Sequence, residues 1–276
     1  MGALLGLAAA LAYGVSDYVA GVASRRHHFL WVSFLGTVAA VVGCGAAVAV
    51  ERPDPATAAL AWGALSGVGS AVGTLGLYRG YGHGEMAVAG PLSAVGAAAF
   101  PAVVGAALGE RLPALGLVGV VLAFPAIWLM SRAPQEATGS TRSGTIDGLV
   151  SGAGFGLLFV ALGQAGDGSG LWPVLAGAVV SATLLGLSTA VRRPPWDLDA
   201  RWLGIVLAAG LISVTANVLF FLATHYSLLT VAAVLTSLYP GVTVAMGAVL
   251  LHERPDRWQK AGLALGALAV TAIVVA

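Results

Sequence analysis

The sequence predicts an all-α integral membrane protein with ten transmembrane helices, arranged as two inverted repeats of five. Three observations predict this class: an apolar composition, ten separate apolar runs, and a match between the two halves of the chain. Of the 276 residues, 58% are hydrophobic and 9% are charged, and the mean hydropathy is +0.92. A soluble domain averages about 25% charged residues. Most of the surface must therefore face lipid.

Each run has close to the roughly 20 apolar residues that a helix needs to cross a bilayer. Charges, prolines or glycine-rich turns separate the runs. Tryptophans such as Trp31, Trp128 and Trp258 fall near run ends, and indole rings favour the headgroup level. The expected spans are 2–22, 30–50, 57–78, 86–108, 114–131, 147–166, 172–191, 203–225, 229–251 and 259–276.

The two halves of the chain match each other at a nearly constant offset. Trp31 pairs with Trp172, and "VERP" at 50–53 pairs with "VRRP" at 191–194. Because each half holds five helices, the second half must enter the membrane upside down relative to the first. Inverted repeats place a binding site at their shared interface near the midplane. The expected divisions are a first repeat at 1–131, a polar linker at 132–146 and a second repeat at 147–276.

The positive charges favour one orientation. Of the 13 Lys and Arg residues, only Arg52 and Arg111 fall in loops after even-numbered helices. Cytoplasmic loops are enriched in Lys and Arg. The bias therefore places both termini outside the cytoplasm.

Asp17 is the deepest acid, inside an apolar helix that we expect to end near residue 22. It then lies roughly 10 Å below the interface, and a charged carboxylate near a helix centre costs about 2.5–3.5 kcal/mol. Asp17 must therefore face a cavity, contact a partner or take up a proton. Helical spacing puts Tyr13 and Ser16 on the same face. The alternative is that Asp17 only hydrogen-bonds a neighbouring helix.

Two further positions are candidates for a cavity wall. Asn217 lies near the middle of the eighth span, one turn after Ser213, and needs partners across a helix seam or in a wet cavity. Tyr239 precedes Pro240, whose missing N–H frees a backbone carbonyl in the ninth span. We expect Pro240 and Pro91 to act as structural kinks, since membrane helices tolerate proline where neighbours satisfy the freed groups.

One stretch carries a family resemblance. The segment "LTSLYPGVTVAMGAVLLHERPDRWQKAGLALGALAV" (235–270) has a Tyr-Pro turn inside a helix and a Glu253-Arg254 pair at its end. Its looser counterpart, 90–121, keeps the pair as Glu110-Arg111 in "GERLPALGLVG". Together the halves resemble two EamA domains of the drug/metabolite transporter superfamily. The resemblance covers essentially the whole chain, and both Glu-Arg pairs resemble a recurring turn that we expect to cap helices and form interfacial pairs.

The resemblance implies a multi-pass protein of the plasma (inner) membrane that carries a small metabolite, amino acid or drug-like compound, with export as the expected direction. It also implies a central cavity lined by helices 1, 3, 4, 6, 8 and 9, with helices 5 and 10 at the periphery. Relatives with ten helices have cytoplasmic termini, whereas the arginines of this chain favour the reverse. Both orientations stay open.

The sequence therefore predicts a secondary active transporter with alternating access and proton coupling through Asp17. Its expected partners are a small-molecule substrate, the lipid bilayer and protons. No enzyme activity, metal or cofactor is expected, because no nucleotide-binding Gly-Lys-Ser loop and no helical histidine pair for a metal occur. The net charge of +1 gives no electrostatic case for nucleic acid. The alternatives are an uncoupled exchanger or uniporter of the same fold, and an intramembrane enzyme that modifies lipids.

Overall fold

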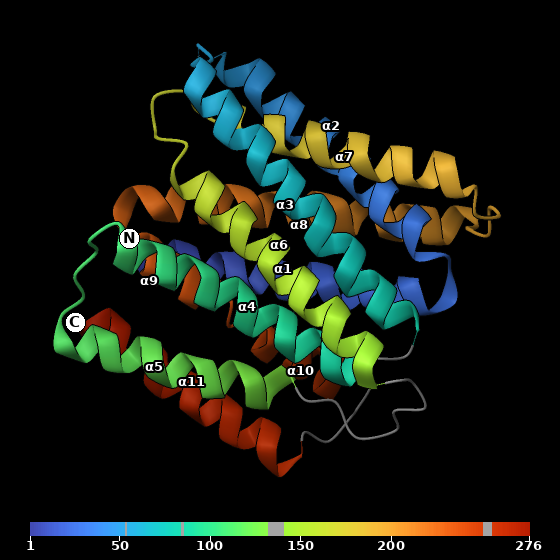
Figure 1. Ribbon diagram of the computed structural model, residues 1–276. Helices are drawn as coiled ribbons and strands as arrows, with labels where there is room; N and C mark the ends of the chain where they lie inside the picture. The colour runs from blue at the N-terminus through green and yellow to red at the C-terminus, as the bar shows by residue number, and fades with distance from the viewer. Residues whose placement is uncertain (53, 84–85, 132–140, 251–255) are drawn as a thin grey trace.

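The computed structural model describes residues 1–52, 54–83, 86–131, 141–250 and 256–276, and within them it is all-helical (Figure 1). Ten of its helical stretches are long and apolar enough to cross a membrane, which confirms the predicted fold class. The helices are α1 (Gly2–Arg26), α2 (Phe29–Glu51), α3 (Thr57–Gly82), α4 (Met86–Ala107), α5 (Ala114–Ser131), α6 (Thr141–Gly163), α7 (Trp172–Arg192), α8 (Ala200–Tyr226), α9 (Leu229–Thr236), α10 (Pro240–Leu250) and α11 (Arg257–Val275).

Several helices extend beyond the apolar runs that predict them. Helix α1 continues to Arg26 rather than ending near residue 22, and α6 begins at Thr141 rather than at residue 147. Polar residues at a span end do not stop a helix, because they reach the headgroup region while the backbone hydrogen bonds continue. Residues 141–146 of the expected linker are therefore helical, whereas 132–140 lie outside the described residues.

The ninth span is interrupted at its centre. Helix α9 ends at Thr236, and α10 begins at Pro240. Proline has no N–H to donate, and the backbone here forms tighter turns instead: Tyr239 donates to Thr236 O and Val242 donates to Tyr239 O. By contrast, α4 runs unbroken through Pro91, five residues after its start.

The packing pairs one half of the chain with the other. The most extensive contacts join α4 with α6, α3 with α6, α5 with α11, α1 with α8 and α3 with α7. Each span has a counterpart five spans away in the other half. The pair α3–α6 therefore corresponds to α8–α1, and the pair α3–α7 corresponds to α8–α2. Both corresponding pairs also pack against each other. The two halves therefore interlock about an approximate two-fold axis.

The same relation appears in the backbone conformation. Arg52 and Arg193 occupy matching places in "VERP" and "VRRP", and they are the described non-glycine residues with positive φ, at 48° and 46°. Each terminates a helix in the left-handed conformation, with its N–H bonded to Val48 O or Thr189 O. The sequence match thus corresponds to a matched helix ending.

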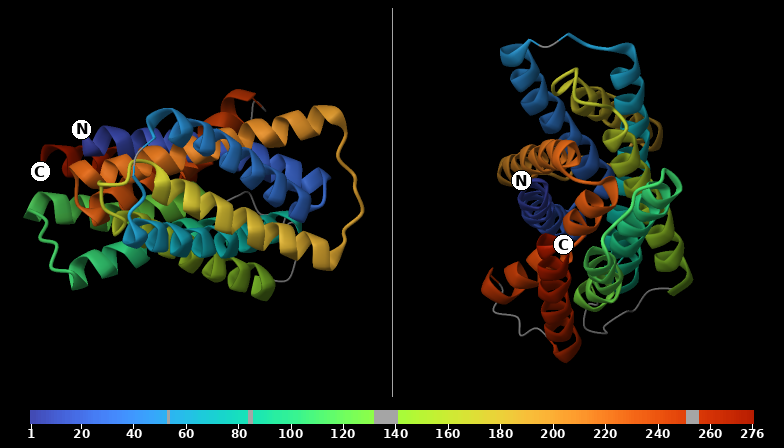
Figure 2. Two further views of the ribbon diagram at one scale, coloured as in Figure 1. Left: turned by 90° about the horizontal axis from the view of Figure 1, so that it is seen from above. Right: turned by 90° about the vertical axis from the view of Figure 1, so that its left-hand side faces the viewer.

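The bundle has two distinct ends. Both termini lie at one of them, which we call the termini end (Figures 1 and 2). Loops after odd-numbered spans meet at the other, where the His28 N–H donates to Asp197 across 2.9 Å. We call this the arginine-rich end, since it carries Arg25, Arg26, Arg79, Arg192 and Arg193. Helices α1 and α6 consequently run in opposite directions.

Candidate functional site

Two adjoining cavities lie between the halves near the centre of the bundle. The smaller, of about 40 Å³, is lined from α1, α3, α4, α6, α8 and the break before α10. These are the six spans that the family resemblance implies. The larger, of about 70 Å³, also takes residues from α2 and α7. Both cavities are roomy enough for water, which needs roughly 10–15 Å³. The residues common to both walls are Ser70, Thr74, Tyr78, Leu158, Ser213 and Asn217.

Asp17 lines the smaller cavity. Because α1 ends at Arg26, the residue lies nine positions inside the helix, or roughly 14 Å along its axis from that end. Its carboxylate has no hydrogen bond or ion pair within the described part of the chain. The alternative of a simple hydrogen bond to a neighbouring helix therefore has no support in this geometry.

Three tyrosines line the smaller cavity together with Asp17: Tyr13, Tyr78 and Tyr239. Tyr78 is absent from the sequence-predicted site. It occurs in "GLYRGYG" at 76–82, one turn before Tyr81, and the two tyrosines share one face of the helix.

The other predicted wall residues form specific contacts between the halves. Tyr13 Oη donates to Asn217 Oδ1 across 2.7 Å, and Asn217 Nδ2 donates to Ser213 O at 3.2 Å. Ser16 Oγ donates to Ala209 O at 3.0 Å and lines the larger cavity. Tyr239 is buried, lines the smaller cavity, and lies with its ring centroid 6.5 Å from that of Tyr13. All five predicted substrate or coupling residues thus line the two cavities.

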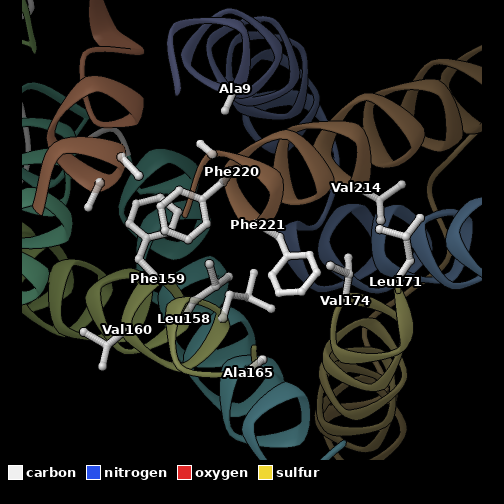
Figure 3. Packing of buried hydrophobic residues seen from close by; sticks show 14 of the residues in the cluster. Ala9, Leu158, Phe159, Val160, Ala165, Leu171, Val174, Val214, Phe220 and Phe221 are labelled. Atoms are coloured by element: carbon white, nitrogen blue, oxygen red, sulfur yellow. The ribbon is translucent and has the colours of Figure 1, made fainter. Parts of the chain in front are cut away.

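A buried apolar cluster lies beside the cavities, and Leu158 belongs to the cluster and to both cavity walls (Figure 3). The rings of Phe159 and Phe220 pack with centroids 4.3 Å apart, and Phe221 is also fully buried. Phe159 lies near the end of α6 and Phe220 near the end of α8, so both rings come from the second half.

A buried ion pair joins the halves. Asp147 is 0% exposed and is held by two guanidinium nitrogens of Arg79, whose side chain is 46% exposed. Asp147 is the first residue of the expected sixth span, but α6 begins six residues earlier, so Asp147 lies inside the helix. A buried carboxylate needs such a partner, since an unpaired charge in this setting is costly.

Glu110 has a more specific contact than an interfacial pair. Its carboxylate accepts from Leu229 N at 2.6 Å and from Thr230 N at 3.1 Å, and it also accepts from Thr230 Oγ1 at 2.6 Å. It therefore caps the N-terminus of α9 in the other half, where a negative charge is favourable. Arg111 is exposed. Glu253 and Arg254 lie outside the described residues.

Comparison with known proteins bears on the second half directly. Residues 142–275 match the model of the EamA-like transporter family. The second half is therefore similar to an EamA-like transporter domain. No curated protein matches the chain. One solved crystal structure aligns with 99% of this chain and 96% of its own, at a TM-score of 0.78 and 14% identity, which shows a shared fold.

The ten apolar helices and the EamA match support an integral, multi-pass membrane protein. Within the described residues, no three His, Cys, Asp or Glu side chains gather into a group that could hold a metal ion.

Proposed function

We propose that this protein is a proton-coupled secondary active transporter that exports a small solute by alternating access between its two halves. The observation that carries the proposal is the unpaired Asp17 carboxylate on the wall of a cavity between inverted halves. Inverted-repeat transporters place their sites at this interface. A charge at this depth without a partner is expensive and marks a functional group.

The contacts between the halves support alternation. Arg79–Asp147 joins α3 to α6 at the arginine-rich end, and Glu110 joins the α4–α5 connection to α9 at the termini end. Rocking one half against the other would open one end by separating one of these links while the other is kept. The cavities remain between the halves throughout such a movement.

Proton coupling rests on the surroundings of Asp17. Protonation would remove the charge of Asp17 and leave the cavity wall neutral. A neutral wall costs less free energy to rearrange within the membrane. The first half is proposed as a second EamA domain, on the strength of the matched helix endings and the interlocked packing. We place the protein in the plasma (inner) membrane.

Proteoliposomes test this function with a defined panel of labelled amino acids, sugars and small amines. We expect at least one to enter in a saturable manner, faster under a pH gradient than after an ionophore collapses it. Asp17→Asn should lower this gradient-driven flux at least tenfold while the protein stays folded. Asp167→Asn, which alters an exposed acid between α6 and α7, is the matched control and should leave flux unchanged.

Three results would contradict the proposal. Equal flux with and without the gradient indicates an exchanger or uniporter. Gradient-driven flux that persists in Asp17→Asn removes the coupling role of Asp17. Product formation from lipid in detergent, without a sealed compartment, indicates an enzyme.

A further inference from the structure

The charge on the cavity walls has one sign. Asp17 is the charged residue among those that line either cavity, and no described Lys, Arg or His lines them. The guanidinium of Arg79 is paired with Asp147, and Arg79 lines a separate groove. A ligand bound beside Asp17 therefore meets a single negative charge with no compensating positive one.

Aromatic rings make up much of the wall around this charge. Tyr13, Tyr78 and Tyr239 line the smaller cavity together with Phe155 and Phe159. The Tyr13 ring lies 6.0 Å from that of Phe159 and 6.5 Å from that of Tyr239, with interplanar angles of 65° and 52°. Ring faces carry partial negative charge and attract cations within about 6 Å. The rings, like the carboxylate, therefore favour a positively charged ligand.

The remaining wall offers hydrogen-bond acceptors at the same place. The hydroxyl groups of Ser70, Thr74 and Ser213 line the smaller cavity beside Asn217. Hydroxyl oxygens and the amide carbonyl accept from N–H donors. An ammonium group next to Asp17 would find partners for its three protons, whereas a hydrated metal cation would have to strip its water against mostly neutral oxygens.

We propose that this site selects a small monovalent organic ammonium ion over the amino acid with the same side chain. A monovalent cation and Asp17 together form a neutral complex, whereas a zwitterion leaves one uncompensated carboxylate among aromatic rings. Buried charges are costly unless they are paired. The cavities of about 40 and 70 Å³ restrict the ligand to a few heavy atoms in this conformation. The inference rests on the proposed function only in taking this site as the substrate site.

Three compounds of one skeleton separate the contribution of each charge: isopentylamine, leucine and 4-methylpentanoate. Binding to the purified full-length protein in nanodiscs is measured by calorimetry at pH 8, where an alkylamine remains charged. We expect isopentylamine to bind at least tenfold more tightly than leucine, and 4-methylpentanoate to show no binding. Equal or tighter binding of leucine, or no binding of isopentylamine to the folded protein, overturns the proposal.

Variants locate the preference in the residues that carry it. Asp17→Asn should abolish the tenfold preference, whereas Asp167→Asn should keep it. Tyr78→Phe retains the ring and should weaken isopentylamine binding less than Tyr78→Leu, which removes it. A preference that survives Asp17→Asn contradicts the assignment.

The two proposals fail in different ways. Isopentylamine that binds but does not cross sealed proteoliposomes would overturn the transport function and leave the ligand class intact. Gradient-driven flux of leucine without isopentylamine binding would support the transport function and overturn the proposed ligand class.

Discussion

At the scale of single residues, the site depends on a contact between two neutral side chains from different halves. Tyr13 in α1 donates to Asn217 in α8, and Asn217 in turn donates to a backbone carbonyl of its own helix. The bond fixes the Asn217 amide orientation and holds the Tyr13 ring beside Asp17. A partly buried polar pair of this kind contributes about 1 kcal/mol to the free energy of unfolding. Removing only one partner costs more, because the other is left without a hydrogen bond.

Removing either partner should lower stability, and removing both should cost less than the sum. We expect Tyr13→Phe to lower the melting temperature by roughly 2–4 °C for each kcal/mol lost. A thermal-unfolding cycle of Tyr13→Phe, Asn217→Ala and the double variant should give a coupling of about 1 kcal/mol. Tyr226→Phe, at an exposed tyrosine, is the control and should be neutral. Strict additivity in the cycle would show that the bond contributes nothing.

Residue-level prediction from the sequence succeeds where a side chain is out of place for its surroundings. Asp17 and Asn217 are polar residues in apolar spans, so the cost of burial alone marks them. Tyr78 is ordinary near a helix end, and only the packing of α3 against α1 brings it to the cavity that Asp17 lines. The partner of Glu110 could not be predicted, because it lies 119 residues away in the other half.

At the scale of helices, Glu110 acts as a cap supplied by another half. The first N–H groups of α9 have no partners within their own helix, and the short α9 has few other anchors. Glu110→Ala should therefore destabilise the protein by about 1–2 kcal/mol. Glu51→Ala, which removes an exposed acid at the same end of the molecule, is the matched control. Equal melting temperatures for the two variants would contradict the capping role.

Close helix approach at Gly14 fixes the position of the break in the ninth span. A Cβ added at Gly14 would lie 2.5 Å from Val242 Cβ and 2.8 Å from the Tyr239 carbonyl oxygen. A backbone oxygen cannot move aside without shifting the segment that carries Tyr239. Gly14→Ala should therefore cost about 1–3 kcal/mol through overpacking, seen as a lower melting temperature.

Gly204 provides the opposite case within a helix. A Cβ there has nothing within 4 Å, so Gly204→Ala should stabilise α8 by about 0.5–1 kcal/mol. A Gly14→Ala variant as stable as Gly204→Ala would show that α1 is free to move away from the break.

Helix-level prediction was accurate in number and imprecise at the ends. Hydropathy along the sequence shows the length of each apolar run, and it therefore predicts all ten spans. It does not record that α1 and α6 continue through Ser24–Arg26 and 141–146, because polar residues at a headgroup boundary cost a helix little. The ninth span breaks before Pro240, whereas α4 runs unbroken through Pro91 and Pro101, so the presence of a proline alone does not predict a break.

At the scale of the whole molecule, the remaining question is which end faces the cytoplasm. The structure gathers Arg25, Arg26, Arg79, Arg192 and Arg193 at one end and both termini at the other. Cytoplasmic loops of membrane proteins carry the excess of Lys and Arg. This charge distribution favours a cytoplasmic arginine-rich end, against the arrangement that the family resemblance implies.

Single cysteines in a Cys44→Ala background test the orientation. Asp167→Cys places an exposed thiol near the termini end, and His83→Cys places one at the arginine-rich end. Cys44 is 2% exposed in α2, so its removal leaves the surface unchanged. In spheroplasts of expressing bacteria, a membrane-impermeant maleimide should label Asp167→Cys directly and His83→Cys only after lysis. The reverse pattern would place both termini in the cytoplasm, and export would then begin at the termini end rather than at the arginine-rich end.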